Sequence, residues 1–103
     1  MATYLCIEIR RIMDHDQYAR YVAAARRIVQ AHGGVYLLTG NRVWTLSGEP
    51  PPERVVVIRF PDRQALDRCF ASREYREIAP LRERSTESRA LVIEDGSPAS
   101  ACT

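Results

Sequence analysis

The chain alternates between segments in which apolar residues recur at every second position and segments in which they recur at every third or fourth. In residues 3–11 the two-residue period places Leu5, Ile7 and Ile9 on one face, as in a half-buried strand. The next segment carries an apolar stripe at helical spacing, consisting of Tyr18, Tyr21, Val22, Ala25, Ile28, Val29 and His32. Asp14 stands before this stripe as an expected helix N-cap. These periods predict a strand followed by one long amphipathic helix.

A double glycine, Gly33-Gly34, marks the end of this helix, because glycine adopts positive φ angles at no steric cost. Beyond it the pattern predicts, in order, a strand over 35–38, a turn over 39–42, a strand over 43–47, a proline-rich break over 48–53 and a strand over 54–60. A second helix is expected from Asp62, and a further helical segment from Ser72, bent or divided by Pro80. A last strand is expected over 89–94.

The resulting order, β-α-β-β-α-β with one extra arm, favours an α+β fold of the ferredoxin-like type, an antiparallel sheet with both helices on one face. In that topology the first and third core strands are central, which places residues 5–9 beside the run Val55-Val56-Val57-Ile58. A length of 103 residues argues for one domain, which we expect over residues 1–95. The small and polar residues 96–103 are expected to form a disordered tail.

The run Val55–Ile58 carries large apolar side chains on both faces of its strand, whereas two helices cover only one face of a sheet. Leaving such side chains in water forfeits roughly 1.5–3 kcal/mol for each of them. A second copy of the sheet would cover them, and closed two-fold pairing is the commonest oligomeric arrangement. We therefore expect a homodimer through the sheet face, with the arm around Trp44 reaching the partner.

Composition and charge exclude several classes of function. The net charge is +2, with 15 basic and 13 acidic residues interspersed, so we expect no nucleic-acid partner. No apolar run approaches the ~20 residues that span a bilayer, and Glu8 and Arg10 interrupt any signal-peptide core, so a cytoplasmic protein is expected. Cys6, Cys69 and Cys102 lack the spacing of metal ligands. Phosphate loops and dinucleotide fingerprints are absent from the sequence, and we expect no cofactor.

Several sequence pieces together resemble one family over almost the whole chain, from about residue 3 to Gly96. The pieces are Asp14…Tyr18…Tyr21-Val22-Ala23-Ala24-Ala25, His32-Gly33-Gly34-x-Tyr36-Leu37, Arg54-Val55-Val56-Val57-Ile58-x-Phe60-Pro61, Ser72-x-Glu74-Tyr75 and Leu81-Arg82. In their order and spacing they resemble the domain-of-unknown-function family 1330, which belongs to the dimeric α/β-barrel superfamily. The resemblance implies the ferredoxin-like fold and a dimer formed sheet to sheet.

The resemblance implies no single activity. Related families of the superfamily include cofactor-free monooxygenases, lactone isomerases and polyketide cyclases, beside members without established chemistry. Family members commonly carry Arg after the double glycine and Glu before the glycine that ends the arm. This chain has Val35 and Ser47 at those positions, which leaves any mechanism based on that pair without its charges.

The candidate catalytic residues are His32 and Glu8. Histidine titrates near neutral pH and can act as a general base, but His32 lies in the last turn of a helix, where capping or packing is the favoured role. Glu8 and Arg59 each interrupt a strand expected to be central, and adjacent strands could place them across from one another. They would then form a buried ion pair or a cleft carboxylate. Alternatively, Arg59 points outward and Glu8 is solvated.

The candidate substrate-binding residues are Tyr18, Tyr36, Tyr75, Arg82 and Arg59. The tyrosines would line a pocket between helices and sheet, or each would pack its ring at the edge of the core. Arg82 would anchor a carboxylate or enolate, or it would tie the last helix to Glu87 or a backbone carbonyl.

Our leading hypothesis is a homodimer that binds or transforms a small organic acid or polyketide-like metabolite by cofactor-free proton transfer, as an isomerase or cyclase does. His32 or Glu8 would be the base, and a pocket in which Tyr18, Arg82 and a carboxylate converge would favour this reading. Two alternatives stay open: a non-catalytic dimeric ligand-binding or accessory module, and a cofactor-independent monooxygenase. Pockets filled by side chains would favour the module.

Overall fold

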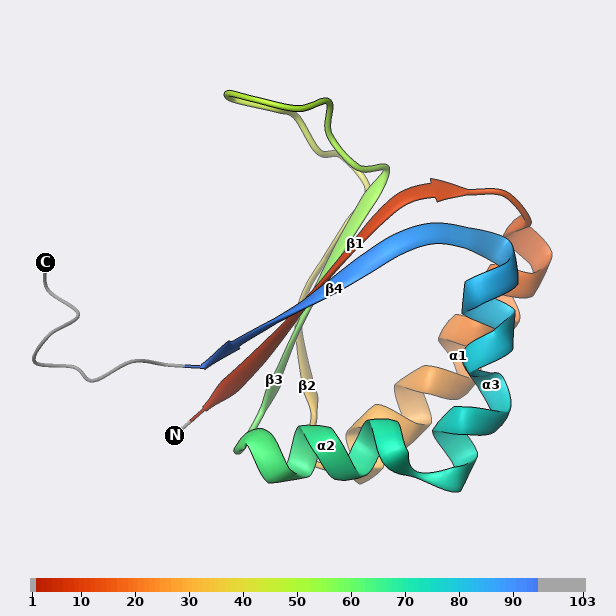
Figure 1. The fold of residues 1–103 in the computed structure, drawn as a ribbon, viewed down its shortest axis with the longest axis vertical. Coiled ribbons are helices and arrows are strands. Elements are labelled where there is room, and N and C mark those ends of the chain that lie inside the picture. Colours follow the sequence, from red (N-terminus) through yellow and green to blue (C-terminus); the bar gives the residue numbers. More distant parts are fainter. Residues whose placement is uncertain (1, 95–103) are drawn as a thin grey trace, which may run out of the picture.

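The described part of the chain, residues 2–94 of a computed structural model, forms four strands and three helices. In chain order these are β1 (Thr3–Ile12), α1 (His15–Ala31), β2 (Val35–Gly40), β3 (Arg54–Phe60), α2 (Arg63–Ala71), α3 (Arg73–Ser85) and β4 (Thr86–Glu94). The strands form one antiparallel sheet in the order β2-β3-β1-β4, and the helices lie on one side of it (Figure 1). The expected α+β, ferredoxin-like architecture is confirmed. The segment expected to be a disordered tail, 96–103, lies outside the described residues.

The two central strands pair as the apolar pattern requires. Leu5 of β1 lies opposite Ile58 of β3, and Ile7 lies opposite Val56, so the expected pairing of these strands is confirmed. Because side chains alternate between the two faces of a strand, Leu5, Val56, Ile58 and Phe60 all point toward the helices, where they are buried. This side of the sheet, which we call the covered face, packs on α1 and α2.

Short polar side chains start the helices at the expected places. Asp14 accepts a hydrogen bond from the backbone N–H of Gln17 at 3.1 Å, and Ser72 accepts one from the N–H of Tyr75 at 3.2 Å. Ser72 separates α2 from α3, as the pattern predicted. Pro80 does not divide the helix, since α3 is continuous through it.

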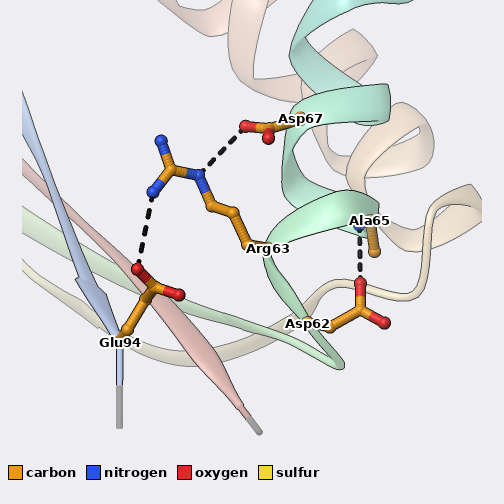
Figure 2. Close-up of polar contacts among 5 residues, drawn as sticks. All are labelled: Asp62, Arg63, Ala65, Asp67 and Glu94. Carbon is orange, nitrogen blue, oxygen red and sulfur yellow. Dashed lines mark hydrogen bonds and ion pairs between the residues drawn. The ribbon is translucent and has the colours of Figure 1, made fainter. Parts of the chain in front are cut away.

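Figure 2 shows how the start of α2 is tied to its surroundings. Asp62 caps the helix by accepting a hydrogen bond from the N–H of Ala65 at 2.8 Å. Arg63 pairs with Asp67 one turn later at 3.1 Å, and its Nη1 lies 3.8 Å from Oε1 of Glu94 on β4. These side chains are about half exposed, so the pairs contribute little to stability and mainly orient the helix.

The double glycine brings the end of α1 close against β3. Gly33 adopts a φ of +83°, which favours glycine. At Gly34 a Cβ would collide with the side chain of Val29 and come within 3.1 Å of the Phe60 ring. Any larger residue at Gly34 would therefore push α1 away from the sheet.

Residues 41–53 form a loop, and the strand expected over 43–47 is wrong. The loop projects from the end of the sheet, away from the helices (Figure 1), with Trp44 76% and Leu46 102% exposed. Among the described residues the outer edge of β2 is free, but the segment does not pair with it: β2 continues through Gly40, where a turn was expected, and the chain leaves the sheet from there. The consecutive prolines that follow also lack backbone donors.

The other side of the sheet, which we call the open face, is not covered by the helices (Figure 1). Tyr4 and Cys6 of β1 lie at its centre, opposite Ile93 and Leu91 of β4. In the pairing of β1 with β3, Cys6 lies opposite Val57. Exposure of large apolar side chains is high on this face, at 51% for Ile93, 38% for Leu91, 45% for Val35 and 55% for Leu38. A contiguous apolar surface of this kind marks an interaction site.

Candidate functional site

A small cavity, here called the inner cavity, lies between α1 and the covered face of the sheet. Its volume is about 30 Å³. The polar part of its wall consists mainly of phenol and guanidinium groups, from Tyr18, Tyr21, Tyr36, Arg26, Arg54 and Arg82. The rest is mostly apolar, so this is a pocket with a few convergent polar groups, as small-molecule sites commonly are.

Arg54 occupies the first position of β3, where the alternation of side chains directs it to the covered face together with Val56 and Ile58. Its Cζ lies 5.7 Å from the centre of the Tyr18 ring, and its Nε is buried without a hydrogen-bond partner. A buried donor left unpaired is costly unless a ligand or water satisfies it. Sequence reasoning missed this residue, although a charge at an inward strand position is a recognisable signal.

The other two arginines approach the cavity from the helices. Arg26 of α1 stacks on Tyr36 of β2, with its Cζ 4.8 Å from the ring centre. Arg82 of α3 donates a hydrogen bond to Oγ of Ser88 at 3.1 Å. Burial alone would lower the pKa of Arg82, but the neighbouring phenol of Tyr75 and other groups raise it overall. Arg82 therefore keeps its positive charge in the half-buried wall.

The tyrosines are held as neutral hydrogen-bonding groups. The hydroxyls of Tyr21 and Tyr75 are 2.8 Å apart in a buried contact. Burial raises the pKa of Tyr21 far above its usual value, and it raises those of Tyr18 and Tyr36 against the opposing effect of Arg54 and Arg26. At neutral pH these phenols can donate a hydrogen bond or a proton, but they do not act as bases.

The wall of the inner cavity carries positive charge without a counter-ion. Its lining includes no Asp, Glu or His. Arg26, Arg54 and Arg82 take no part in the ion pairs found among residues 2–94. The carboxylate expected to converge with Tyr18 and Arg82 is therefore not present in this wall. The arrangement favours a bound anion.

His32 lies away from this cluster, at the C-cap of α1. Its Nδ1 is 2.9 Å from the backbone oxygen of Ile28, and because a carbonyl only accepts, Nδ1 carries the hydrogen. The backbone N–H of His32 also bonds to Val29. This geometry corresponds to the capping role, and His32 is not among the residues that line the cavity.

Glu8 and Arg59 both lie on the open face, at separate places. Glu8 stands opposite Val55 and accepts a hydrogen bond from Nε of Arg89 at 3.1 Å. Arg59 is exposed and stands opposite Tyr4, four residues from Glu8 along β1, or about 13 Å at the usual rise of a strand. Of the two alternatives for these residues, pairing across adjacent strands is wrong, and Arg59 points outward as the other alternative has it. The inner cavity thus brings together Tyr18, Tyr36 and Arg82, with Tyr75 next to it through Tyr21, whereas His32, Glu8 and Arg59 lie elsewhere.

A wider depression, here called the outer groove, adjoins the inner cavity. It has a volume of about 850 Å³ and lies between the first turns of α1 and the base of the 41–53 loop. Tyr18 and Arg54 line both spaces, so they form the junction between them. Sequence reasoning did not find the groove, because its two walls are far apart in the chain.

Within residues 2–94 there is no group of three or more His, Cys, Asp or Glu side chains that could hold a metal ion. Cys6 and Cys69 are free thiols, and Cys102 lies outside the described residues. Burial raises the pKa of the Cys69 thiol to about 11, so it is not a thiolate at neutral pH. Among the described residues no helix has the length and apolar character needed to cross a membrane.

Solved structures share this fold at low sequence identity. A protein of unknown function from Rhodopseudomonas palustris superposes with a TM-score of 0.79 at 17% identity, over 94% of this chain and 84% of that one. A dimeric ferredoxin-like protein of unknown function from Jannaschia sp. CCS1 gives 0.74 at 15% identity, over 92% and 100%. SnoaB from Streptomyces nogalater, a cofactor-independent oxygenase, gives 0.59 at 9% identity, over 96% and 95%. These likenesses establish the fold alone.

Comparison with curated proteins gives no significant match. A family model, "Domain of unknown function (DUF1330)", matches residues 2–96, which is nearly the whole chain. This is the family that the sequence pieces resemble. The chain therefore belongs to the DUF1330 family.

Proposed function

We propose that this protein binds a small organic anion, with the anionic group in the inner cavity. The observation that carries the proposal is a wall with three arginines and no carboxylate, in which the Nε of Arg54 is buried without a partner. Arg26, Arg54 and Arg82 supply the charge, while Tyr18 and Tyr36 supply hydrogen-bond donors. Guanidinium groups recognise carboxylates and enolates through paired hydrogen bonds, which suits this wall.

The chemistry that such a wall supports is cofactor-free proton transfer of the isomerase or cyclase kind. Arginine and phenol groups stabilise negative charge on the oxygen of a substrate that binds already ionised as its enolate. A neutral tyrosine can then transfer its hydroxyl proton to the enolate carbon, and the resulting phenolate takes a proton back from water. Tyr18 at the junction is the proposed proton donor. His32 and Glu8 have no part in this proposal, because neither lines the cavity.

A second candidate is a non-catalytic ligand-binding or accessory module. Two observations favour it: the inner wall holds no side chain that is a base at neutral pH, and its volume of about 30 Å³ leaves room for only a few heavy atoms. Binding without turnover would leave the ligand chemically unchanged after long incubation.

Binding can be tested by isothermal titration calorimetry with acetate and benzoate as probes. We expect binding of at least one carboxylate, weakened about tenfold or more in Arg54→Met, because a hydrogen bond to a charged group contributes roughly 1.5–3 kcal/mol. Arg20 is an exposed arginine of α1 that lines neither the cavity nor the groove, so Arg20→Met is the matched control and should leave the affinity unchanged. Absence of carboxylate binding, or equal losses in both variants, would contradict the proposal.

We further propose that the protein is a homodimer paired through the open face, with Trp44 of the loop as an anchor on the partner. The exposed apolar side chains of that face support the proposal, as does the dimeric state named for the Jannaschia neighbour. Light scattering at micromolar concentration should give the mass of two chains, and Val57→Asp should reduce it to one. A stable wild-type monomer would refute the pairing.

A further inference from the structure

We propose that the ligand is a flat, apolar monocarboxylate, such as an aryl acid, that occupies both spaces: its carboxylate in the inner cavity and its apolar body in the outer groove. This inference rests on the proposed function and adds the class of ligand to it. Three features carry it, namely the sizes of the two spaces, the chemistry of the groove and the position of Arg54 between them.

The volumes are strongly unequal. The inner cavity offers about 30 Å³, which is enough for an anionic head but not for a ring system. The outer groove offers about 850 Å³, within the range of roughly 300–1,000 Å³ that is usual for small-molecule sites. A ligand that uses both spaces must therefore have a small charged end and a larger body.

The groove suits an apolar and flat body. One wall is a stripe of α1 with small side chains, Ala19 and Ala23, beside Val22. The opposite wall includes Pro51 and Pro52, which offer no backbone N–H. The groove also carries the polar side chains of His15, Asn41 and Glu53, but the alanines and prolines of its two walls can bury apolar surface of the ligand's body.

The charged groups at the junction determine the orientation. Arg54 and Tyr18 line both spaces, so an anion beside Arg54 can extend its body into the groove without leaving the guanidinium. Glu53, on the groove side, is anchored by its backbone N–H, which donates to the oxygen of Ile9 at 2.9 Å. Its carboxylate would repel a second negative charge on the body, which selects a monocarboxylate.

The test is calorimetric titration of the full chain with three probes: acetate, benzoate and 2-naphthoate. We expect affinity to rise with ring number, with 2-naphthoate binding at least tenfold more tightly than acetate, as added apolar burial requires. Ala19→Trp should fill the groove and weaken 2-naphthoate about tenfold or more, while acetate changes by less than about threefold. Ala31→Trp is the matched control, since it is an exposed alanine of the same helix outside the groove.

The outcomes separate this inference from the proposed function. Equal affinity for the three probes, with loss in Arg54→Met, would refute the role of the groove and leave anion binding intact. Binding of no probe would refute both. Equal losses of 2-naphthoate in Ala19→Trp and Ala31→Trp, or a changed molecular mass in Ala19→Trp by light scattering, would overturn the inference, because the groove would then be no ligand site or a contact between copies. Ala23→Trp repeats the test if Ala19→Trp fails to fold.

Discussion

The two faces of the sheet carry charge in opposite ways. On the covered face Arg26, Arg54 and Arg82 surround a cavity without a carboxylate. On the open face Glu8 is matched by Arg89 among exposed apolar side chains, and the further charge of Arg59 is exposed to solvent and not enclosed in a cavity. Unmatched positive charge in a half-buried wall is suited to an anionic ligand, whereas apolar surface with paired charges is suited to another protein surface. The difference locates the two proposed functions of this fold, ligand binding and pairing, on opposite sides of the same strands.

The largest expected effect concerns the apolar residues of β3. Ile58→Ala on the covered face should lower the free energy of unfolding by about 2–5 kcal/mol, because Ile58 is 1% exposed and its loss leaves a cavity. Urea denaturation measures it. Val57→Ala, its neighbour on the open face, should have a smaller effect that grows with protein concentration, since the proposed dimer buries Val57. Equal effects at all concentrations would contradict the assignment of the two faces.

A second comparison uses two arginines. Arg82→Met should weaken benzoate binding by about tenfold or more, because it removes positive charge from the wall of the inner cavity. Arg59→Met removes a charge from the open face and should change benzoate affinity by less than about twofold. Calorimetric titration of both variants with benzoate measures the two affinities. A larger loss in Arg59→Met would show that benzoate binds on the open face and would contradict the proposed site.

The buried tyrosine pair offers a pH test. Tyr21 is held protonated in the folded state, since burial raises its pKa far above the value of about 10 that holds in the unfolded chain. The unfolded chain therefore releases its proton first as pH rises, so stability is fully present below pH ~10 and is lost above it. Tyr21→Phe should reduce this alkaline loss, and at neutral pH it should cost about 1–2 kcal/mol by leaving the Tyr75 hydroxyl unpaired.

Tyr4→Phe on the open face is the control for that test. Tyr4 makes no side-chain hydrogen bond among those found in residues 2–94, so Tyr4→Phe removes a phenol without leaving a buried hydroxyl unpaired. Thermal unfolding followed by circular dichroism between pH 7 and pH 11 compares the three proteins. Identical profiles for both variants would contradict the role of the buried pair.

The smallest effect is expected at the ion pair between Glu8 and Arg89. Glu8→Gln should lower the free energy of unfolding by less than about 1 kcal/mol, because Arg89 is largely exposed and salt screens such pairs. Urea denaturation at low and high salt measures the difference. A cost of several kcal/mol would show that Glu8 is buried in a dimer interface as an essential ion pair.

Much of the fold followed from local patterns. The apolar periods of residues 3–11 and 54–60 predicted the central strands, and Asp14, Asp62 and Ser72 predicted the helix starts. Such signals succeed because a cap or an alternating face involves residues within one turn or one strand. The strand predicted over 43–47 was wrong because alternation alone does not make a strand: β2 continues through Gly40, and the chain then leaves the sheet as a loop although, in the described part of the chain, the outer edge of β2 is free.

The candidate site residues lie in different places. Tyr18, Tyr36 and Arg82 line the inner cavity, and Tyr75 lies beside it with its hydroxyl against that of Tyr21. Their role in binding a substrate stays a prediction. Arg54 was overlooked, although its position in the alternation of β3 directs it inward. For Glu8 and Arg59 the sequence left two alternatives open, because the offset between two strands is set by their pairing register and not by the sequence of either one.

The sequence by itself determined the class of elements, their order, their caps and which strand faces are apolar, because these depend on periods and on residues close in the chain. Only the tertiary structure decided that three arginines from α1, β3 and α3 share one wall without a carboxylate, and that Tyr18 and Arg54 join the inner cavity to the outer groove. The physical reason is that such a wall is a product of strand register and helix packing, which are long-range properties that no local pattern encodes.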